Sequence, residues 1–490
     1  MFAGTGSDVG KSVVATAFCR IFRQDGYSPA PFKAQNMALN SYATPEGLEI
    51  GRAQAVQAEA AGIPCHTDMN PLLLKPSSDH TSQVVLNGRP IGNRDAYDFW
   101  RRGRTTTCAS QLSCEEQTLD FRQEVCAAFD RLAARYNPIV MEGAGSISEL
   151  NLRDTDLVNL PMARYAKACV ILVADIDRGG VFASAYGSIA LQTPEDRSLI
   201  KGIIINKFRG DLRLFDSGRK MLEDICGVPV LGVIPYAKDI HIEEEDSVVL
   251  GEKLKARSEQ AAAGRVNIAV VLLRHISNFT DFDTLERDPR VNLFYTNNTD
   301  DISHADIIIV PGSKATLDDL LELRRNGCAQ AIQRAHRDGK RIVGICGGYQ
   351  MLGQMVEDPE GIEGDVARLP GLGLLPITTT MANEKTTRQT TFEFQGEKCQ
   401  GYEIHQGVST LADGRQADAI VQTERCIGTY IHGFLDNSPV IEYLLRGFDT
   451  QALSPALSPQ AYKEQQYDLL ADHVRRHVDI DRIYQILQAP

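Results

Sequence analysis

The stretch Met1-Phe2-Ala3-Gly4-Thr5-Gly6-Ser7-Asp8-Val9-Gly10-Lys11-Ser12 has the features of a phosphate-binding loop. Such a loop needs glycines so that backbone N–H groups can close around phosphate oxygens, a lysine for the outer phosphates and a hydroxyl for Mg²⁺. The apolar run 13–21 predicts the helix whose N-terminus completes the anion site. Thr5 stands where the common motif has its first glycine, so this loop is a variant. The predicted nucleotide-binding residues are Gly6, Ser7, Asp8, Val9, Gly10, Lys11 and Ser12.

Only Met1, Phe2 and Ala3 precede this loop, whereas a strand usually runs about five residues. We therefore expect the natural N-terminus to lie further upstream.

Composition describes an ordinary globular protein of more than one domain. A chain of 490 residues exceeds what one core normally supports, and it is 43% hydrophobic and 23% charged. It has no apolar run of about 18 residues, and Met1 leads directly into the loop rather than into a signal peptide, so we expect a cytoplasmic protein. Eleven cysteines without a C-x-x-C pair argue against a disulfide framework or a structural zinc site. The net charge of −13 argues against nucleic-acid and membrane partners.

Short β-branched runs alternate with helical patterns along the chain, which predicts a parallel α/β fold. Expected strands lie at 139–141, 170–174, 202–205 and 230–234 in the first half, and at 267–273, 306–310 and 341–345 in the second. The segment 238–264 is charged and then rich in alanine and glutamine, as in a linker. The predicted divisions are a P-loop domain at 1–236, a linker at 237–264, a second α/β domain at 265–445 and a helical extension at 446–490.

The strand at 341–345 runs into Cys346-Gly347-Gly348-Tyr349, which is a nucleophile elbow with cysteine in place of serine. A free thiol is mostly protonated at neutral pH, so a base is expected close by. His432 is the candidate base, with His405 and His275 as other options. The alternative is a structural cysteine at a helix start.

A second glycine turn, Pro311-Gly312-Ser313-Lys314, follows another expected strand. The backbone N–H groups of Gly312 and Gly347 are predicted to form an oxyanion hole. An ordinary turn at the end of a strand would have the same sequence.

The first half carries its own polar groups at strand ends. Glu142 follows the strand at 139–141 and suits Mg²⁺ together with Ser12. Asp175 and Asp177 could bind metal or cap the next helix, and the sequence leaves both open. Asn206 could read the adenine edge.

The amide-rich segment 33–41 lies close to the nucleotide loop in sequence. A surface loop and a substrate site are equally compatible with its composition. The predicted substrate-binding residues are Lys33, Gln35, Asn36 and Asn40.

Taken together, these strings resemble the cobyric acid synthase family, the glutamine-dependent amidoligases of cobalamin biosynthesis. The resemblance runs from Gly4 to Asp481. Its most specific strings lie at 34–41, 70–76, 151–154, 175–182, 206–211, 275–283 and 344–353.

The resemblance implies an N-terminal domain like dethiobiotin synthetase and a C-terminal class I glutamine amidotransferase domain. It implies that Lys11 and Ser12 serve ATP and Mg²⁺, Glu142 the metal, Cys346 the glutamine and His432 the thiol. The implied substrate is the corrinoid adenosylcobyrinic acid a,c-diamide, amidated at its b, d, e and g carboxylates. No tightly bound prosthetic group is expected, and the oligomeric state stays open.

The sequence differs from the family pattern at two places, and two other functions are possible alternatives. The stretch 93–119 is unlike the family pattern, so no substrate contact is assigned there. Many class I glutaminases have a glutamate two residues after the histidine, where this chain has Phe434. We therefore expect a Cys–His dyad unless another acid, such as Asp436, orients the ring. The rivals are cobyrinic acid a,c-diamide synthase and a regulatory P-loop ATPase fused to an inactive glutaminase-like module.

Overall fold

The computed structural model describes residues 1–76, 81–95, 105–109, 116–243, 264–449 and 457–488. Within these ranges, every helix is too short or too polar to span a bilayer. The chain forms two compact units. Unit 1 comprises Met1–Met37, Ile50–Glu243 and Tyr462–Pro490, and unit 2 comprises Ala38–Glu49 and Glu244–Ala461.

This division differs from the predicted boundaries at two places. Ala38–Glu49 groups with unit 2, and the C-terminal Tyr462–Pro490 groups with unit 1 instead of forming a separate extension. Most of the predicted linker 237–264 and much of the stretch 93–119 lie outside the described residues.

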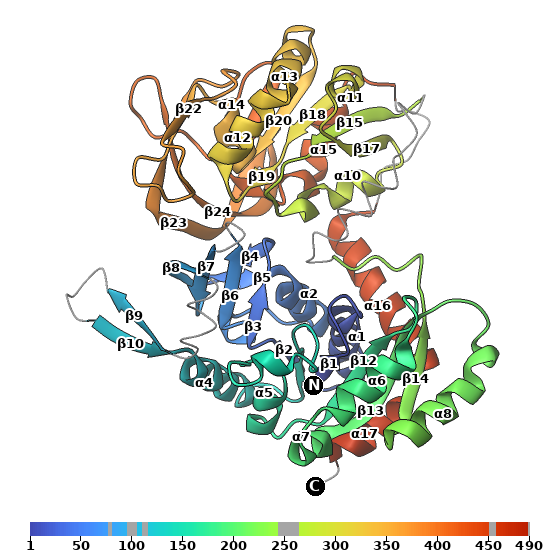
Figure 1. Ribbon diagram of the computed structural model, residues 1–490. Helices are drawn as coiled ribbons and strands as arrows, with labels where there is room; N and C mark the ends of the chain where they lie inside the picture. The colour runs from blue at the N-terminus through green and yellow to red at the C-terminus, as the bar shows by residue number, and fades with distance from the viewer. Residues whose placement is uncertain (77–80, 96–104, 110–115, 244–263, 450–456, 489–490) are drawn as a thin grey trace. The chain divides into compact units, whose positions relative to one another are not determined.

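Unit 1 is built on a parallel sheet with the order β1-β12-β13-β14 (Figure 1). A parallel pair of strands, β11 and β2, adjoins β1 through a bridge between Phe2 and Glu142. The bounds of these strands are Phe2–Gly4 for β1, Ala30–Phe32 for β2, Ile139–Met141 for β11, Val170–Asp175 for β12, Ile200–Phe208 for β13 and Val230–Pro235 for β14. The four strands expected in this half are confirmed.

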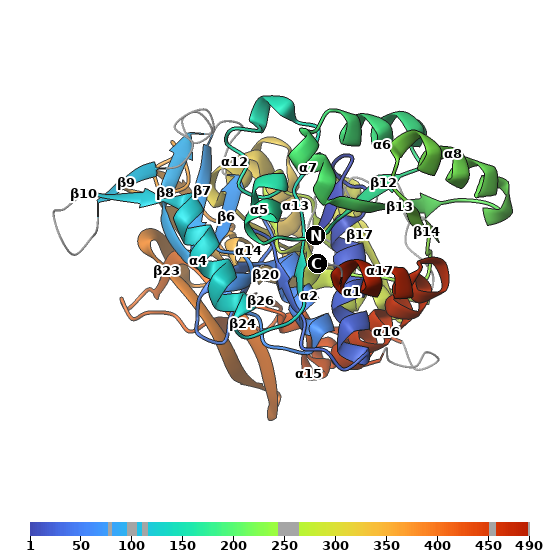
Figure 2. The same cartoon turned by 90° about the horizontal axis from the view of Figure 1, so that it is seen from below.

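Alternate residues of β12 enter two separate cores, as the period of a strand requires. Ile171 and Val173 pack with α1 (Lys11–Gln24), α16 (Pro459–His477) and α17 (Ile480–Gln488). Leu172 and Ala174 pack with α6 (Val181–Ala190) and α8 (Asp216–Cys226) on the opposite face. The view from below shows these two helical layers on either side of β12 and β13 (Figure 2).

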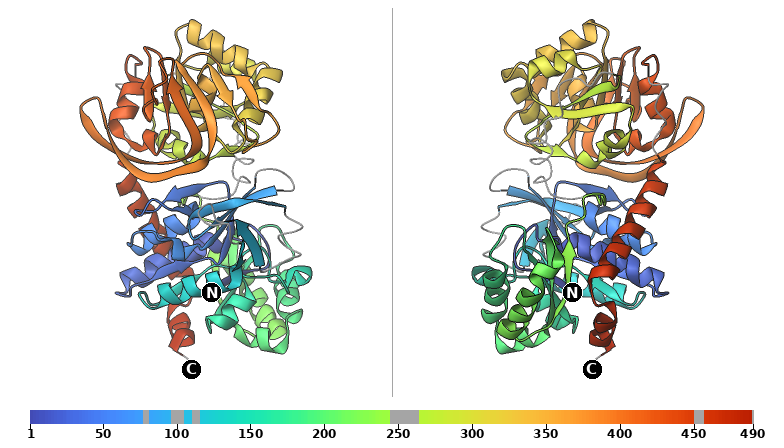
Figure 3. Two further views of the ribbon diagram at one scale, coloured as in Figure 1. Left: turned by 90° about the vertical axis from the view of Figure 1, so that its left-hand side faces the viewer. Right: turned by 90° about the vertical axis from the view of Figure 1, so that its right-hand side faces the viewer.

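The C-terminal helices complete the first of these layers. Tyr467, Leu470 and Val474 of α16 are buried in the same core as Val14 and Phe18 of α1. Arg20 Nε also donates to Asp468 Oδ1 at 2.7 Å. Helix α16 therefore runs beside the start of the chain (Figure 3), although more than 400 residues separate the bonded pair.

Unit 1 also contains a second, smaller sheet and four further helices. A small sheet has the order β3-β6-β7-β8, with bounds Gln35–Met37, Leu72–Pro76, Thr81–Leu86 and Arg89–Asp95. The helices of this region are α2 (Arg52–Ala61), α4 (Phe121–Ala133), α5 (Leu160–Tyr165) and α7 (Pro194–Leu199).

Unit 2 contains a six-stranded sheet with the order β17-β15-β18-β20-β26-β25, in which all neighbours are parallel except β25 and β26. The strand bounds are Val266–Val271 for β15, Val291–Thr296 for β17, Ile307–Val310 for β18, Arg341–Ile345 for β20, Ile420–Gln422 for β25 and Cys426–Thr429 for β26. The three strands expected here are confirmed as β15, β18 and β20. The mixed α/β class predicted for both halves is therefore confirmed.

A long antiparallel hairpin lies beside this sheet and was not predicted. Its strands are β23 (Ile377–Phe394) and β24 (Glu397–Leu411), and β24 also pairs with the short β27 (Ile431–His432). The hairpin is the extended brown and orange element of Figure 3. The pairing of Tyr402 with His432 brings it to the C-terminal end of β26.

Candidate active sites

The phosphate-binding loop of unit 1 connects β1 to α1. Gly10, directly before the helix, has φ 91°, and a Cβ there would lie 2.2 Å from Asn206 Nδ2. Both the left-handed backbone and this close approach require glycine. Lys11 Nζ donates to the carbonyl oxygens of Gly6 at 2.8 Å and Gly145 at 3.0 Å. The ammonium group is therefore held against the loop that it is predicted to serve.

Two residues near the end of β13 donate hydrogen bonds to the backbone of the same loop. Asn206 Nδ2 donates to the carbonyl of Val9 at 2.9 Å, and Lys207 Nζ donates to that of Asp8 at 2.5 Å. Adenine recognition by Asn206 stays a prediction. In the structure the side-chain amide of Asn206 donates a hydrogen bond to the backbone of the loop.

Glu142 is the centre of a buried polar cluster. Its carboxylate is 1% exposed and accepts hydrogen bonds from Ser12 Oγ at 2.8 Å, Lys33 Nζ at 2.8 Å and Gln57 Nε2 at 2.6 Å. Burial works to raise the pKa of Glu142, but Lys33 and the other two donors outweigh it and hold the pKa below its usual value. Gln57 was not predicted, because nothing in the local pattern of α2 indicates that this side chain reaches the end of a strand.

The donor set suits Mg²⁺. Ser12 and Glu142 are hard oxygen ligands in contact, and Mg²⁺ beside nucleotide phosphates commonly uses only one or two protein groups. In the described ranges, no group of three or more histidine, cysteine, aspartate or glutamate side chains could hold a metal ion on its own.

Of the two alternatives for Asp175 and Asp177, capping of the next helix is wrong, and metal binding stays a prediction. Gly180, not an aspartate, is the N-cap of α6, and no side chain caps that helix. Asp175 instead accepts the backbone N–H of Asp177 at 2.7 Å and faces Lys207 Nζ at 3.3 Å. Asp177 pairs with Arg209 at 2.6 Å. These acids organise the loop after β12.

The four predicted substrate-binding residues have different surroundings and do not form one cluster in the structure. Lys33 bonds to Glu142, and Asn36 Nδ2 donates to Gln54 Oε1 at 3.1 Å. Asn40 belongs to unit 2, is 1% exposed and, among the described residues, has no hydrogen-bond partner for its carboxamide. Gln35 lines the pocket described next.

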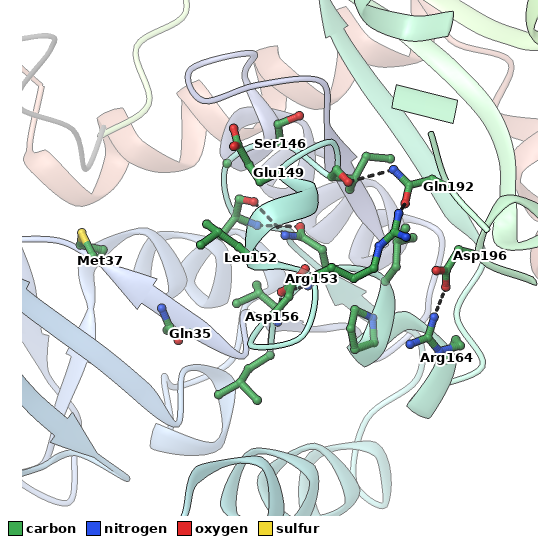
Figure 4. A pocket seen from close by; sticks show the side chains of 18 residues that line it. Gln35, Met37, Ser146, Glu149, Leu152, Arg153, Asp156, Arg164, Gln192 and Asp196 are labelled. Atoms are coloured by element: carbon green, nitrogen blue, oxygen red, sulfur yellow. Dashed lines mark hydrogen bonds and ion pairs between the residues drawn. The ribbon is translucent and has the colours of Figure 1, made fainter. Parts of the chain in front are cut away.

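That pocket, of about 210 Å³, lies in unit 1 between the loop after Glu142 and α5 (Figure 4). Arg153 lines it and donates to Leu191 O at 3.0 Å and Gln192 Oε1 at 3.2 Å. Arg164 lines it too and pairs with Asp196. Its lining combines these polar groups with apolar ones such as Leu152.

In unit 2, Cys346 has the strained backbone of a nucleophile elbow. It lies between β20 and α14 (Gly347–Leu352) with φ 50° and ψ −108°, and it is 8% exposed. A Cβ at Gly348 would lie 1.9 Å from Val310 O, so glycine is required where the turn packs on β18. Strain of this kind at a non-glycine residue is typical of functional sites. The predicted elbow is therefore present in the structure.

His432 lies beside this thiol and is buried. Its Nδ1 is 2.7 Å from Asp281 Oδ2, which leaves Nε2 for Cys346. Burial lowers the pKa of His432, but the Asp281 carboxylate and the hydrogen bond with Cys346 outweigh it and raise the pKa to about 10. The imidazole is therefore protonated at neutral pH and is placed to stabilise a thiolate.

The predicted dyad is wrong, because Asp281 occupies the position of a third member. Its other oxygen, Oδ1, accepts the backbone N–H of Gly433 at 2.9 Å. Asp436, named as a possible alternative, bonds to Thr284 instead. Asp281 lies within the string 275–283 that carried the family resemblance, but 151 residues separate it from His432.

Phe434 stands where many class I glutaminases have their acid, and it is fully buried. Its ring centroid lies 5.6 Å from that of Phe392 and 5.4 Å from that of Phe394. This aromatic cluster has no room to solvate a carboxylate, which explains why the acid comes from another segment.

The other two candidate histidines have different partners. His275 Nδ1 lies 2.9 Å from Asp319 Oδ1, and this hydrogen bond raises the pKa of His275. The ring of His405 stacks on Tyr430 with centroids 3.7 Å apart, and its Nδ1 faces Gly407 O at 2.9 Å. Both are held by structural contacts.

The two predicted oxyanion turns lie together. A Cβ at Gly347 would be 2.8 Å from the backbone nitrogen of Ser313, and one at Gly312 would be 3.6 Å from His432 Cε1. The N–H groups at the start of α14 have no intrahelical acceptor. The geometry is compatible with an oxyanion hole built from Gly312 and Gly347.

Family comparisons agree with these two sites. Residues 1–249 match the model of the CobQ/CobB/MinD/ParA nucleotide binding domain, and residues 267–440 match that of the CobB/CobQ-like glutamine amidotransferase domain. The fold and the sites thus define a glutamine amidotransferase joined to a P-loop nucleotide-binding unit.

Proteins that match almost the whole chain show which family within this class it belongs to. The cobyric acid synthase of Bacteroides fragilis is 66% identical over 99% of this chain and 98% of its own length. Those of Syntrophobacter fumaroxidans and Salmonella agona are 47% and 44% identical over 99% and 100% of this chain, and each match covers 98% of the relative. The chain belongs to the cobyric acid synthase family.

Proposed function

We propose that this protein amidates the b, d, e and g carboxylates of adenosylcobyrinic acid a,c-diamide with ATP and glutamine, giving adenosylcobyric acid in cobalamin biosynthesis. The observation that carries this proposal is the match to cobyric acid synthases over 99% of the chain, at up to 66% identity. The two sites supply the chemistry that the reaction needs. We further propose that the protein works in the cytoplasm.

The glutaminase reaction uses Cys346, His432 and Asp281. The thiolate attacks the side-chain amide of glutamine, and the N–H groups of Gly312 and Gly347 stabilise the oxyanion. His432 gives its proton to the departing ammonia, and water then hydrolyses the glutamyl thioester. Asp281 keeps the imidazole oriented and favours its charged form.

The synthetase reaction uses the loop 6–12 and the cluster around Glu142. A substrate carboxylate attacks the γ-phosphate of ATP, Lys11 stabilises the charge on the phosphates, and ammonia displaces phosphate from the acyl phosphate. Ser12 and Glu142 would hold Mg²⁺, which neutralises phosphate charge when bound. Lys33 lies beside Glu142. Its ammonium group would neutralise the charge of a phosphate or of the substrate carboxylate.

The pocket beside Gln35 and Arg153 is the proposed place for a carboxylate side chain of the corrinoid. Its volume fits one such arm, and its apolar lining suits the edge of the ring. Three other residues remain proposed substrate-binding residues because they belong to the same polar segment, 33–41, as Gln35. They are Lys33, Asn36 and Asn40.

The proposal is tested by supplying ATP, glutamine and one corrinoid acid at a time, with product masses as the readout. We expect four added amide groups on the a,c-diamide and none on cobyrinic acid. Amidation of cobyrinic acid would instead indicate the a,c-diamide synthase, and ATP hydrolysis without any amidation would indicate a regulatory ATPase.

The acid partner of His432 can be tested by Asp281→Asn. Without the Asp281 charge, burial dominates and the pKa of His432 falls from about 10. Since the proton is present below the pKa, the alkaline limb of glutamine hydrolysis should move to lower pH. We expect kcat to fall roughly 10²- to 10⁴-fold, by analogy with the acid of serine-protease triads.

Asp436→Asn is the matched control for this prediction, because Asp436 lies near His432 in sequence but bonds to Thr284. It should leave the alkaline limb where it is. An unchanged pH profile and rate in Asp281→Asn would show that the imidazole works without this acid.

A further inference from the structure

The segment Ala38–Glu49 lies in the N-terminal third of the chain but packs within unit 2. We call it the strap. It includes the short strands β4 (Ser41–Ala43) and the start of β5 (Glu49–Gly51). The residues just before it, up to Met37, belong to unit 1, where Lys33 bonds to Glu142. The strap is therefore an N-terminal contribution to the amidotransferase unit.

One contact of the strap reaches the segment that carries Asp281. The backbone N–H of Ser41 donates to Asn278 Oδ1 at 3.0 Å. Asn278 precedes the short helix Phe279–Phe282 and has φ 51°, yet its side chain makes no capping bond to that helix. The carbonyl of Asn278 accepts the N–H of Asp281 at 3.0 Å. The strap thus fixes the turn from which Asp281 reaches His432.

A second contact reaches His432. The hydroxyl of Tyr402 donates to Ser41 O at 3.3 Å, and the Tyr402 ring stacks on His432 with centroids 5.3 Å apart at 26°. The ring of Tyr42 packs against the edge of Tyr402 with centroids 4.6 Å apart. Tyr402 is therefore held between the strap and the catalytic imidazole.

A third contact leads to Cys346. Ala43 is fully buried against Tyr402 and Ile404. The carbonyl oxygen of Ile404 lies 3.5 Å from Cys346 Sγ. Each member of the catalytic set therefore has a neighbour that contacts the strap.

The other end of the strap is anchored by buried charge. Glu49 is 1% exposed and pairs with Lys385 Nζ at 2.5 Å, and Gln389 Nε2 donates to Ala43 O. A buried pair of this kind fixes geometry strongly, because displacing either partner leaves an uncompensated charge. The strap is therefore also attached to the hairpin strand β23.

We propose that the strap is a positioning element of the glutaminase centre, acting on Asp281 through Asn278 and on His432 through Tyr402. This inference rests on the proposed glutaminase function. It assigns no chemical step to the strap. Asn278 and Tyr402 are positioning residues, since they hold the groups that react with glutamine.

The test uses Asn278→Gly in the full-length chain. Glycine keeps the left-handed backbone without strain and removes the buried carboxamide whose oxygen accepts the Ser41 N–H. A small displacement of a catalytic group is costly, so we expect kcat for glutamine hydrolysis to fall roughly 10- to 100-fold with little change in KM. Synthesis with free ammonia and the thermal midpoint of unfolding should stay close to those of the unaltered protein.

Gln395→Gly is the matched control, because Gln395 is also a left-handed non-glycine residue of unit 2, with φ 53°, at the turn of the β23–β24 hairpin. It should leave both reactions unchanged. A second variant, Tyr402→Phe, keeps the ring on His432 and removes the hydroxyl that donates to Ser41 O, so a smaller loss of kcat, about 3-fold, is expected.

Unchanged glutamine kcat in Asn278→Gly and Tyr402→Phe would overturn the proposal. If Asn278→Gly does not fold, Tyr402→Phe decides alone: a lower glutamine kcat with normal ammonia-dependent synthesis supports the strap, and an unchanged kcat refutes it. Failure of the unaltered protein to hydrolyse glutamine would instead refute the proposed function, together with the strap inference that rests on it.

Discussion

Cys346→Ser is expected to abolish glutamine-dependent amidation while ammonia-dependent amidation continues. The thiol lies on a strained turn at a helix start, beside the imidazole of His432. A serine hydroxyl in the same place is far less acidic, so the rate with glutamine should fall roughly 10⁴-fold or more. Synthesis with high free ammonia reports the activity of unit 1 alone and should persist.

Cys399→Ser is a suitable control, because Cys399 is also buried in unit 2 but lies on the hairpin strand β24. It should retain glutamine-dependent synthesis. Turnover of glutamine at the normal rate by Cys346→Ser would show that another residue is the nucleophile.

Lys11→Ala should remove synthesis with both nitrogen sources. Both routes need the acyl phosphate, and the lost ammonium group no longer stabilises the charge on the phosphates. A loss of at least about 10²-fold is expected, as for other single electrostatic contributions to a transition state. Basal glutamine hydrolysis by unit 2 should remain and would show that the protein is folded.

Lys220→Ala controls for the removal of a lysine from unit 1, because Lys220 is exposed on α8. It should behave like the unaltered protein. If Lys11→Ala kept near-normal synthesis with ammonia, the role assigned to the phosphate-binding loop would be refuted.

The sequence by itself determined the features that depend on neighbouring residues. The loop 4–12 and the elbow at Cys346 are turns between a strand and the next helix, so their glycines, lysine and cysteine can be read in order. Strand cores such as β12 and β20 were also predictable, since buried parallel strands are continuous apolar runs. Glu142 was identified because it directly follows such a strand.

Only the tertiary structure decided which distant side chains meet. Asp281 reaches His432 across 151 residues, and Gln57 reaches Glu142 across 85, because the sheet and helix packing bring these segments together. The hairpin of β23 and β24 and the placement of Ala38–Glu49 depend on the same long-range packing. A pattern of residue types records local periodicity and turn chemistry, but it does not record the register or the order of strands in a sheet. The partner of the catalytic histidine therefore could not be read from the residues around it.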